Sequence, residues 1–112
     1  MNTEQLASMT IEKFDDTVIV RVSGELDSSN AKTIGDSINE NRSGARACVV
    51  DLSLLTYLDS AALTMLHRLA QSSTGLHIVA PQGSRAGRLV EIGGLDTVLL
   101  THQTLEIALL SL

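Results

Sequence analysis

Hydrophobic and polar residues follow two different periods along the chain, and the first is that of β-strands. In residues 18–23, valines occupy every second position, which is typical of a strand with one buried face. Residues 9–14 are predicted as a further strand. Asp15 and Asp16 between the two favour a tight turn, because their carboxylates bond to nearby backbone amides. The chain is therefore predicted to open with an antiparallel hairpin.

The second period, of three to four residues, predicts helices. Residues 24–27 are expected to form a turn, after which Ser28, Ser29 or Asn30 can cap the first helix. Apolar stripes predict helices from there to about residue 41, then over residues 60–72, 84–92 and 105–112.

Short apolar runs alternate with these helices. Residues 47–52 and 76–80 are apolar apart from Asp51 and His77, as in strands that are covered on both faces, and residues 97–100 are predicted as a further short strand. Strands that alternate with helices after an opening hairpin predict a mixed β-sheet with helices packed on it. The expected fold class is α/β, with α+β also possible, in a single domain over residues 1–112.

The composition limits the partners and the environment of this domain. Its 112 residues are 44% hydrophobic but 2% aromatic, so they can close one aliphatic core. A net charge of −5 and the shortage of aromatic residues argue against nucleic-acid binding. No apolar run reaches the roughly 20 residues of a membrane span, and residues 1–10 lack a secretory signal. We therefore expect a cytoplasmic protein.

The cysteine and histidine residues form no recognisable redox or metal-binding motif. Cys48 is single and lies in an apolar run, so no internal disulfide can form and a core position is expected. His67, His77 and His102 lack the spacing of structural zinc sites. Neither a metal nor another cofactor is predicted.

Two stretches invite comparison with enzyme motifs. His67 follows Ser60 by seven residues, but Leu58 and Ala62 stand where the nucleophile elbow of serine hydrolases has glycines. Residues 83–88 combine glycines with two arginines but lack the Gly-Lys-Ser/Thr ending of a P-loop. They are expected to form an exposed helix start, or to contact an acidic partner or a nucleotide. The chain is not predicted to be an enzyme.

The start of the helix at residue 60 is the strongest candidate for function. Asp59 or Ser60 can simply cap the helix, which contributes about 1 kcal/mol. A hydroxyl at the carboxyl end of a strand is also exposed to ligands, and a phosphate on Ser60 would add about −1.5 to −2 charge. The positive end of the helix dipole favours that charge, whereas Asp59 repels it. Leu55, Tyr57 and Leu58 beside this point can pack inward or form a binding patch.

Three stretches carry a family resemblance. They are Gly-Glu-Leu-Asp at residues 24–27, Val-Val-Asp-Leu at 49–52 followed by Leu-Asp-Ser-Ala-Ala-Leu at 58–63, and Gly-Gly-Leu at 93–95. In sequence, order and separation they resemble the STAS domain, the family of bacterial anti-sigma factor antagonists. The resemblance extends from about residue 9 to residue 112, and it implies a mixed sheet with helices.

The resemblance also implies roles for individual residues. Ser60 resembles the serine phosphorylated by an anti-sigma factor that is itself a serine kinase, Asp59 the acid before it, and Asp27 an acid near the same site. Glu25 is expected to contact the partner with them. Family members with a free serine bind the kinase and release its sigma factor. Phosphorylated members dissociate, and a PP2C-type phosphatase resets them.

Ala61 and Ala62, which are also expected in the partner-binding surface, depart from the family pattern. Active members commonly have glycine after the phosphorylated serine, and alanine is the better helix former by about 1 kcal/mol. A functional but stiffer motif is expected. An alternative stays open, in which the chain is an unphosphorylated STAS subunit of a larger assembly, such as a phospholipid-transport or stress-signalling complex.

Overall fold

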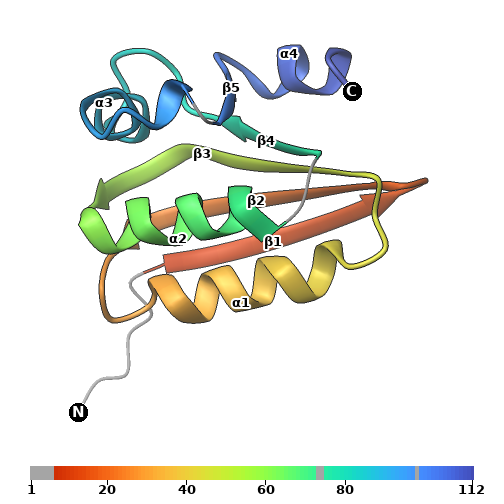
Figure 1. Cartoon of the computed structure of the whole chain (residues 1–112), viewed down its shortest axis with the longest axis horizontal. Coiled ribbons are helices and arrows are strands. Elements are labelled where there is room, and N and C mark those ends of the chain that lie inside the picture. Colours follow the sequence, from red (N-terminus) through yellow and green to blue (C-terminus); the bar gives the residue numbers. More distant parts are fainter. Residues whose placement is uncertain (1–6, 73–74, 98) are drawn as a thin grey trace.

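A computed structural model of the chain describes residues 7–72, 75–97 and 99–112 and contains one mixed sheet of five strands (Figure 1). The strands lie in chain order: β1 (Ala7–Phe14), β2 (Thr17–Leu26), β3 (Ala47–Leu58), β4 (Leu76–Val79) and β5 (Leu100–His102). β1 pairs with β2 antiparallel, and the other neighbouring pairs are parallel. Asp15 in the hairpin turn has a φ of 52°, which aspartate tolerates better than most residues. The predicted opening hairpin and mixed sheet are confirmed.

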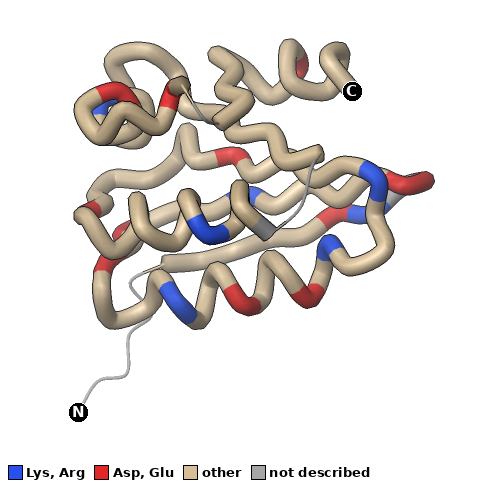
Figure 2. The backbone as a smooth tube through the Cα atoms, viewed as in Figure 1, with Lys and Arg blue, Asp and Glu red and all other residues tan. Residues whose placement is uncertain are grey.

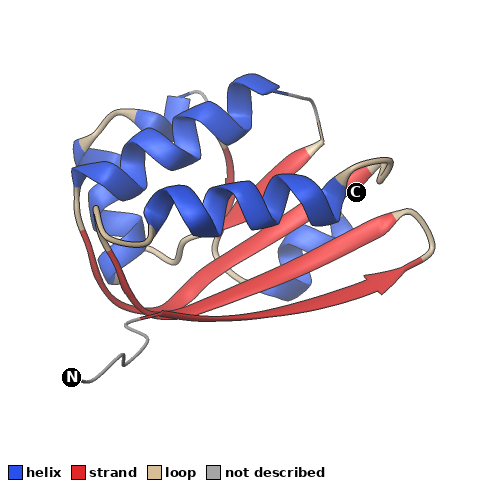
Figure 3. Cartoon of the chain, turned by 90° about the horizontal axis from the view of Figure 1, so that it is seen from below, coloured by secondary structure: helices blue, strands red, loops and turns tan. Residues whose placement is uncertain are grey.

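Helices cover both faces of this sheet. α1 (Ala31–Arg42), α2 (Ser60–Ser72) and α3 (Arg85–Ile92) pack on one face, where α1 and α2 lie side by side, and α4 (Leu105–Leu110) packs on the other (Figure 3). Val50 belongs to the larger core under α1, α2 and α3, whereas Val49 meets Ala108 of α4. Adjacent residues of β3 thus face opposite layers, which explains its continuous apolar run. None of the helices in the described residues is long and apolar enough to cross a membrane.

β2 and β3 are both longer than the sequence pattern predicts. The expected turn at residues 24–27 is wrong for its first three residues, because they continue β2 and pair with the extension of β3 over residues 54–58. The pairing continues to Leu26, opposite Leu58, although its register shifts twice on the way. Gly24 has a φ of 90° at this irregularity, a conformation that glycine adopts without strain. Two segments that each look like a loop in isolation therefore become strands by pairing with each other.

The chain between α3 and β5 also differs from the prediction. A 3-10 turn, η1 (Leu95–Thr97), precedes β5, so the strand expected at residues 97–100 starts three residues late. Leu95 and Leu99 are both buried, and the Leu99 amide donates to the Leu95 carbonyl oxygen at 2.8 Å. A helical turn brings these two leucines to the same side. Leu112, expected in the last helical stripe, lies beyond α4 and is 44% exposed.

Burial in the sheet shifts the pKa of a cysteine and of a histidine. Burial raises the pKa of the Cys48 thiol to about 11, and its expected core position is confirmed. The ring of His77 on β4 stacks on that of His102 on β5, with 3.0 Å between His77 Nδ1 and His102 Nε2. Burial, and to a lesser extent the neighbouring His102, lowers the pKa of His77 below its usual value. His77 therefore favours its neutral form, in which one ring nitrogen donates and the other accepts.

We expect the free energy of unfolding to fall as the pH is lowered from about 7 to about 5. In the unfolded chain His77 binds a proton near pH 6.5, whereas in the folded protein its pKa is lower. Acid therefore favours the unfolded state. Loss of the hydrogen bond between His77 and His102 contributes about 1 kcal/mol to this fall in the free energy of unfolding. Urea unfolding at several pH values measures the slope, which His77→Gln should flatten. His67→Gln, at an exposed position of α2, is the matched control and should keep the slope of the parent chain.

Candidate functional site

The carboxyl ends of β2 and β3 bring the residues of the candidate site together. Leu26 pairs with Leu58, and the Asp59 amide donates to the Leu26 carbonyl oxygen at 3.3 Å. The turn after β2 therefore lies beside the start of α2 (Figure 1). We use the term Ser60 surface for the exposed and half-buried residues at these two strand ends, which are Glu25, Asp27, Asp59, Ser60 and Ala61. Ala62, also predicted to bind a partner, is fully buried in the core.

At the start of α2, the helix cap and the exposed hydroxyl belong to two neighbouring residues. Asp59 is the cap, because its Oδ1 accepts from the Ala61 amide at 2.9 Å and its carbonyl oxygen from the Ala62 amide at 3.0 Å. Ser60 is the first helical residue and is exposed. Its hydroxyl makes no hydrogen bond within the described part of the chain. The Ser60 hydroxyl is therefore free to react or to be contacted.

The turn between β2 and α1 is held by side chains rather than by a helix cap. Asp27 Oδ1 accepts from the amide and the hydroxyl of Ser29, at 2.9 and 2.5 Å, and these bonds lower the pKa of Asp27. The Asn30 side chain donates to the Glu25 carbonyl oxygen at 2.9 Å and accepts from the Asp27 amide at 3.0 Å. Asn30 occupies the cap position of α1 without a side-chain cap bond, so the expected capping by this serine-asparagine stretch is wrong. The turn presents an ionised Asp27 in a fixed position.

A residue that the sequence pattern misses fastens the end of β2 to β3. Thr56 Oγ1 donates to the Gly24 carbonyl oxygen at 3.1 Å. Leu55, on one side of Thr56, is buried, whereas Tyr57, on the other side, is 47% exposed. Residues two apart in a regular strand share a face, so the opposite burial of Leu55 and Tyr57 reflects the register shift at Thr56, which lies between the Gly24–Leu55 and Glu25–Tyr57 pairs. The sequence left open whether these residues pack inward or form a binding patch. In the structure, Leu55 belongs to the core and Tyr57 to the surface.

Carboxylates dominate the charge of the Ser60 surface. Figure 2 shows acidic positions at the end of β2, in the β2–α1 turn and at the start of α2. Among the residues that the structure describes, no three His, Cys, Asp or Glu side chains are arranged to hold a metal ion. A phosphate on Ser60 would gain from the positive end of the α2 dipole but would add to this negative charge. The surface is therefore suited to a cationic region of a partner.

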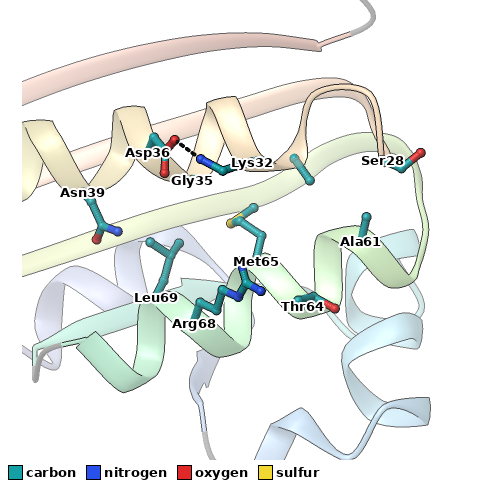
Figure 4. Close-up of a pocket in the computed structure, with 11 residues that line it drawn as sticks. Ser28, Lys32, Gly35, Asp36, Asn39, Ala61, Thr64, Met65, Arg68 and Leu69 are labelled. Carbon is teal, nitrogen blue, oxygen red and sulfur yellow. Dashed lines mark hydrogen bonds and ion pairs between the residues drawn. The ribbon is translucent and has the colours of Figure 1, made fainter.

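A groove between α1 and α2 continues from the Ser60 surface (Figure 4). Ser28 and Ala61 lie at its start, and Met65 lies between the two helices. A Cβ atom on Gly35 of α1 would lie 2.6 Å from Cγ of Met65, so the absence of a side chain lets Met65 pack there. The sequence stripe of α1 does not reveal this groove. A glycine inside a predicted helix is the signal of close packing that points to it.

The arrangement of sheet, helices and serine at the start of α2 can now be compared with known proteins. The family model described as Mlab, STAS domain, matches residues 9–102, which is most of the chain. The chain belongs to the STAS domain family. The predicted family resemblance is thereby confirmed.

Solved structures similar to this STAS domain include an anti-sigma factor antagonist. An anti-sigma factor antagonist from Mycobacterium paratuberculosis is 28% identical, with a TM-score of 0.85 over 94% of this chain and 92% of that chain. A variant of RsbS from Moorella thermoacetica is 21% identical, with a TM-score of 0.73 over 90% of this chain and 91% of that chain. SpoIIAA from Bacillus in its phosphorylated form is 20% identical, with a TM-score of 0.60 over 91% of this chain and 96% of that chain. The last two similarities concern the fold alone.

A stability test should separate Asp59 from Ser60, because only Asp59 bonds to the helix through its side chain. Asp59→Ala should lower the free energy of unfolding by about 1 kcal/mol, since the Ala61 amide loses its acceptor. Asp59→Asn should retain most of the stability, and Ser60→Ala should change it by less than about 0.5 kcal/mol. Urea unfolding of the three variants measures these differences. An equal loss in Ser60→Ala and Asp59→Ala would contradict this assignment of the cap.

Proposed function

We propose that this STAS domain is an anti-sigma factor antagonist. It binds an anti-sigma factor that has serine kinase activity, and phosphorylation of Ser60 by that kinase ends the complex. The observation that carries the proposal is the exposed Ser60 hydroxyl on the first residue of α2, which makes no hydrogen bond within the described chain. The similarity to the anti-sigma factor antagonist from Mycobacterium paratuberculosis supports this role.

The proposed switch acts through local charge and needs no refolding. With a free hydroxyl, the Ser60 surface docks on the partner. A phosphate adds about −1.5 to −2 charge to a surface that already carries Glu25, Asp27 and Asp59. The α2 dipole offsets only about half a charge. An unpaired phosphate in a desolvated interface is strongly unfavourable, so the complex dissociates.

In this proposal the domain is a regulator without catalytic activity of its own, and it acts in the cytoplasm. The kinase transfers the terminal phosphoryl group of ATP to the Ser60 oxygen, ADP is released, and a base of the kinase accepts the hydroxyl proton. A PP2C-type phosphatase hydrolyses the phosphate ester and restores the binding form. In this proposal the domain itself binds no cofactor and no nucleic acid.

A second candidate function is that of an unphosphorylated STAS subunit in a larger assembly. Ala61 and Ala62 favour it, because they replace the glycine that commonly follows the serine in active antagonists. The family description also favours it, since it names Mlab rather than an antagonist. The two candidates differ in whether Ser60 is ever modified.

Phosphorylation in vitro should discriminate between these candidates. We expect incubation with ATP and each serine-kinase anti-sigma factor of the source organism to add one phosphate, measured as intact mass. Ser60→Ala should abolish the addition, because Ser60 carries the free hydroxyl. Ser29→Ala is the control, since the Ser29 hydroxyl is already bonded to Asp27. No modification by any of these kinases would contradict the antagonist and favour the assembly subunit.

Binding should follow the charge at residue 60. Ser60→Ala should retain the affinity for the anti-sigma factor within about threefold, whereas Ser60→Asp should weaken it by about tenfold or more, because it adds a carboxylate to an acidic surface. Calorimetric titration with the purified partner measures both. Equal affinities of the parent chain and Ser60→Asp would count against a charge switch.

A further inference from the structure

A second surface of unusual composition adjoins the Ser60 surface. Tyr57 of β3 and Ile92 of α3 are 47% and 75% exposed, and both line a shallow cavity with Leu89 and two arginines, Arg85 and Arg88. Leu58, the residue before Asp59, lines the same cavity. We use the term α3 surface for Tyr57, Arg85, Arg88, Leu89 and Ile92. It combines exposed apolar side chains with positive charge.

Nothing in the fold accounts for the position of the two arginines. They lie in the first turns of α3, three residues apart on the same side, where the helix dipole and their mutual repulsion both disfavour positive charge. Neither side chain makes an ion pair or a hydrogen bond in the described part of the chain. The helix start is held by Ser84 instead, whose hydroxyl accepts from the Gly87 amide at 3.0 Å and donates to the Pro81 carbonyl oxygen at 2.6 Å. The arginines thus weaken α3 slightly and leave both guanidinium groups available.

The surroundings of the arginines favour an acidic ligand. Both also line a neighbouring cavity with Ser53 and Ser84, and among the described residues no carboxylate lines this cavity or that of the α3 surface. The nearby carboxylates Glu91 and Asp96 line a separate cavity that Arg88 shares. Guanidinium groups bind carboxylates in bidentate fashion, and arginine and tyrosine are enriched where interfaces gain most of their affinity.

We propose that the α3 surface binds an acidic segment of the protein partner, with an apolar side chain of that segment seated against Tyr57 and Ile92. This inference rests on the proposed function, because it concerns the same partner. The Ser60 surface is acidic and the α3 surface is basic, and they meet at Leu58 and Asp59. The partner must therefore present a cationic region opposite Asp27 and Asp59 and an acidic region opposite the arginines. This division of charge fixes the orientation of the complex.

Site-specific photocrosslinking of the whole chain in the source cells tests the proposal. The photoreactive residue p-benzoylphenylalanine at Tyr57 or Ile92 probes the α3 surface, and at Ser28 it probes the neighbourhood of the Ser60 surface. At Ser43, an exposed residue after α1, it controls for random collision. We expect the first three positions to crosslink the same protein and Ser43 to crosslink none. The peptide joined to Tyr57 or Ile92 should be net acidic by mass spectrometry.

Charge reversal supplies the matched control. Arg85→Glu combined with Arg88→Glu should lower the Tyr57 crosslinking yield about tenfold. Lys13→Glu combined with Arg46→Glu changes the net charge equally at the hairpin end of the sheet and should leave the yield unchanged.

The outcomes separate this inference from the proposed function. Crosslinks from Ser28 alone would overturn the inferred role of the α3 surface and leave the proposed antagonist function standing. The absence of crosslinks from Ser28, Tyr57 and Ile92 would overturn both the inference and the proposed function. A lipid, nucleic acid or non-acidic peptide joined to Tyr57 would also overturn the inference. So would a yield that the arginine reversal does not change.

Discussion

The parallel pairing between the last residues of β2 and of β3 is the interaction on which the candidate site depends. It continues through two irregularities as far as Leu26 and Leu58, and the Asp59 amide adds one more bond to the carbonyl oxygen of Leu26. Parallel strands end at the same edge of a sheet, so this pairing places the turn before α1 beside the start of α2. Without it, Asp27 and Ser60 would belong to two independent loops. Their spatial relation is therefore as rigid as the sheet itself.

The same extension of β3 creates the division of charge on this edge. β3 continues to Leu58, and the register shift between Leu55 and Tyr57 turns Tyr57 outward beside α3, while Leu55 stays in the core. Acidic residues follow β2 and β3, and the arginines of α3 lie on the other side of Leu58. The net charge of the whole chain, −5, does not reveal this arrangement, because the acidic and the basic surface are summed in it. Specific docking depends on the local pattern, which sets the orientation and the on-rate of association.

Much of this architecture could be predicted from the sequence, and the failures have a common cause. The alternating valines from Val18 to Val22 and the apolar run of β3 are strong local signals, and both predict strands that the structure contains. The extensions at residues 24–26 and 54–58 could not be predicted, because only their mutual hydrogen bonds make them strands. Capping was ambiguous for a similar reason, since Asn30 and Asp59 are both good caps and only the fold shows that Asn30 braces the turn instead. The placement of Arg85 and Arg88 beside Tyr57 likewise requires tertiary structure.

A regulatory serine at a helix start faces a conflict between stability and availability. A serine at the cap position bonds to the helix amides, so its modification would break the bond that holds the helix. Here Asp59 makes that bond and Ser60 follows it, so a group on the Ser60 oxygen leaves the Asp59 to Ala61 contact in place. Ala61 and Ala62 reinforce the same turn, each by about 1 kcal/mol relative to glycine. The first turn of α2 thus keeps its shape in either state, and the response to modification is set by charge at the surface rather than by unfolding of the helix.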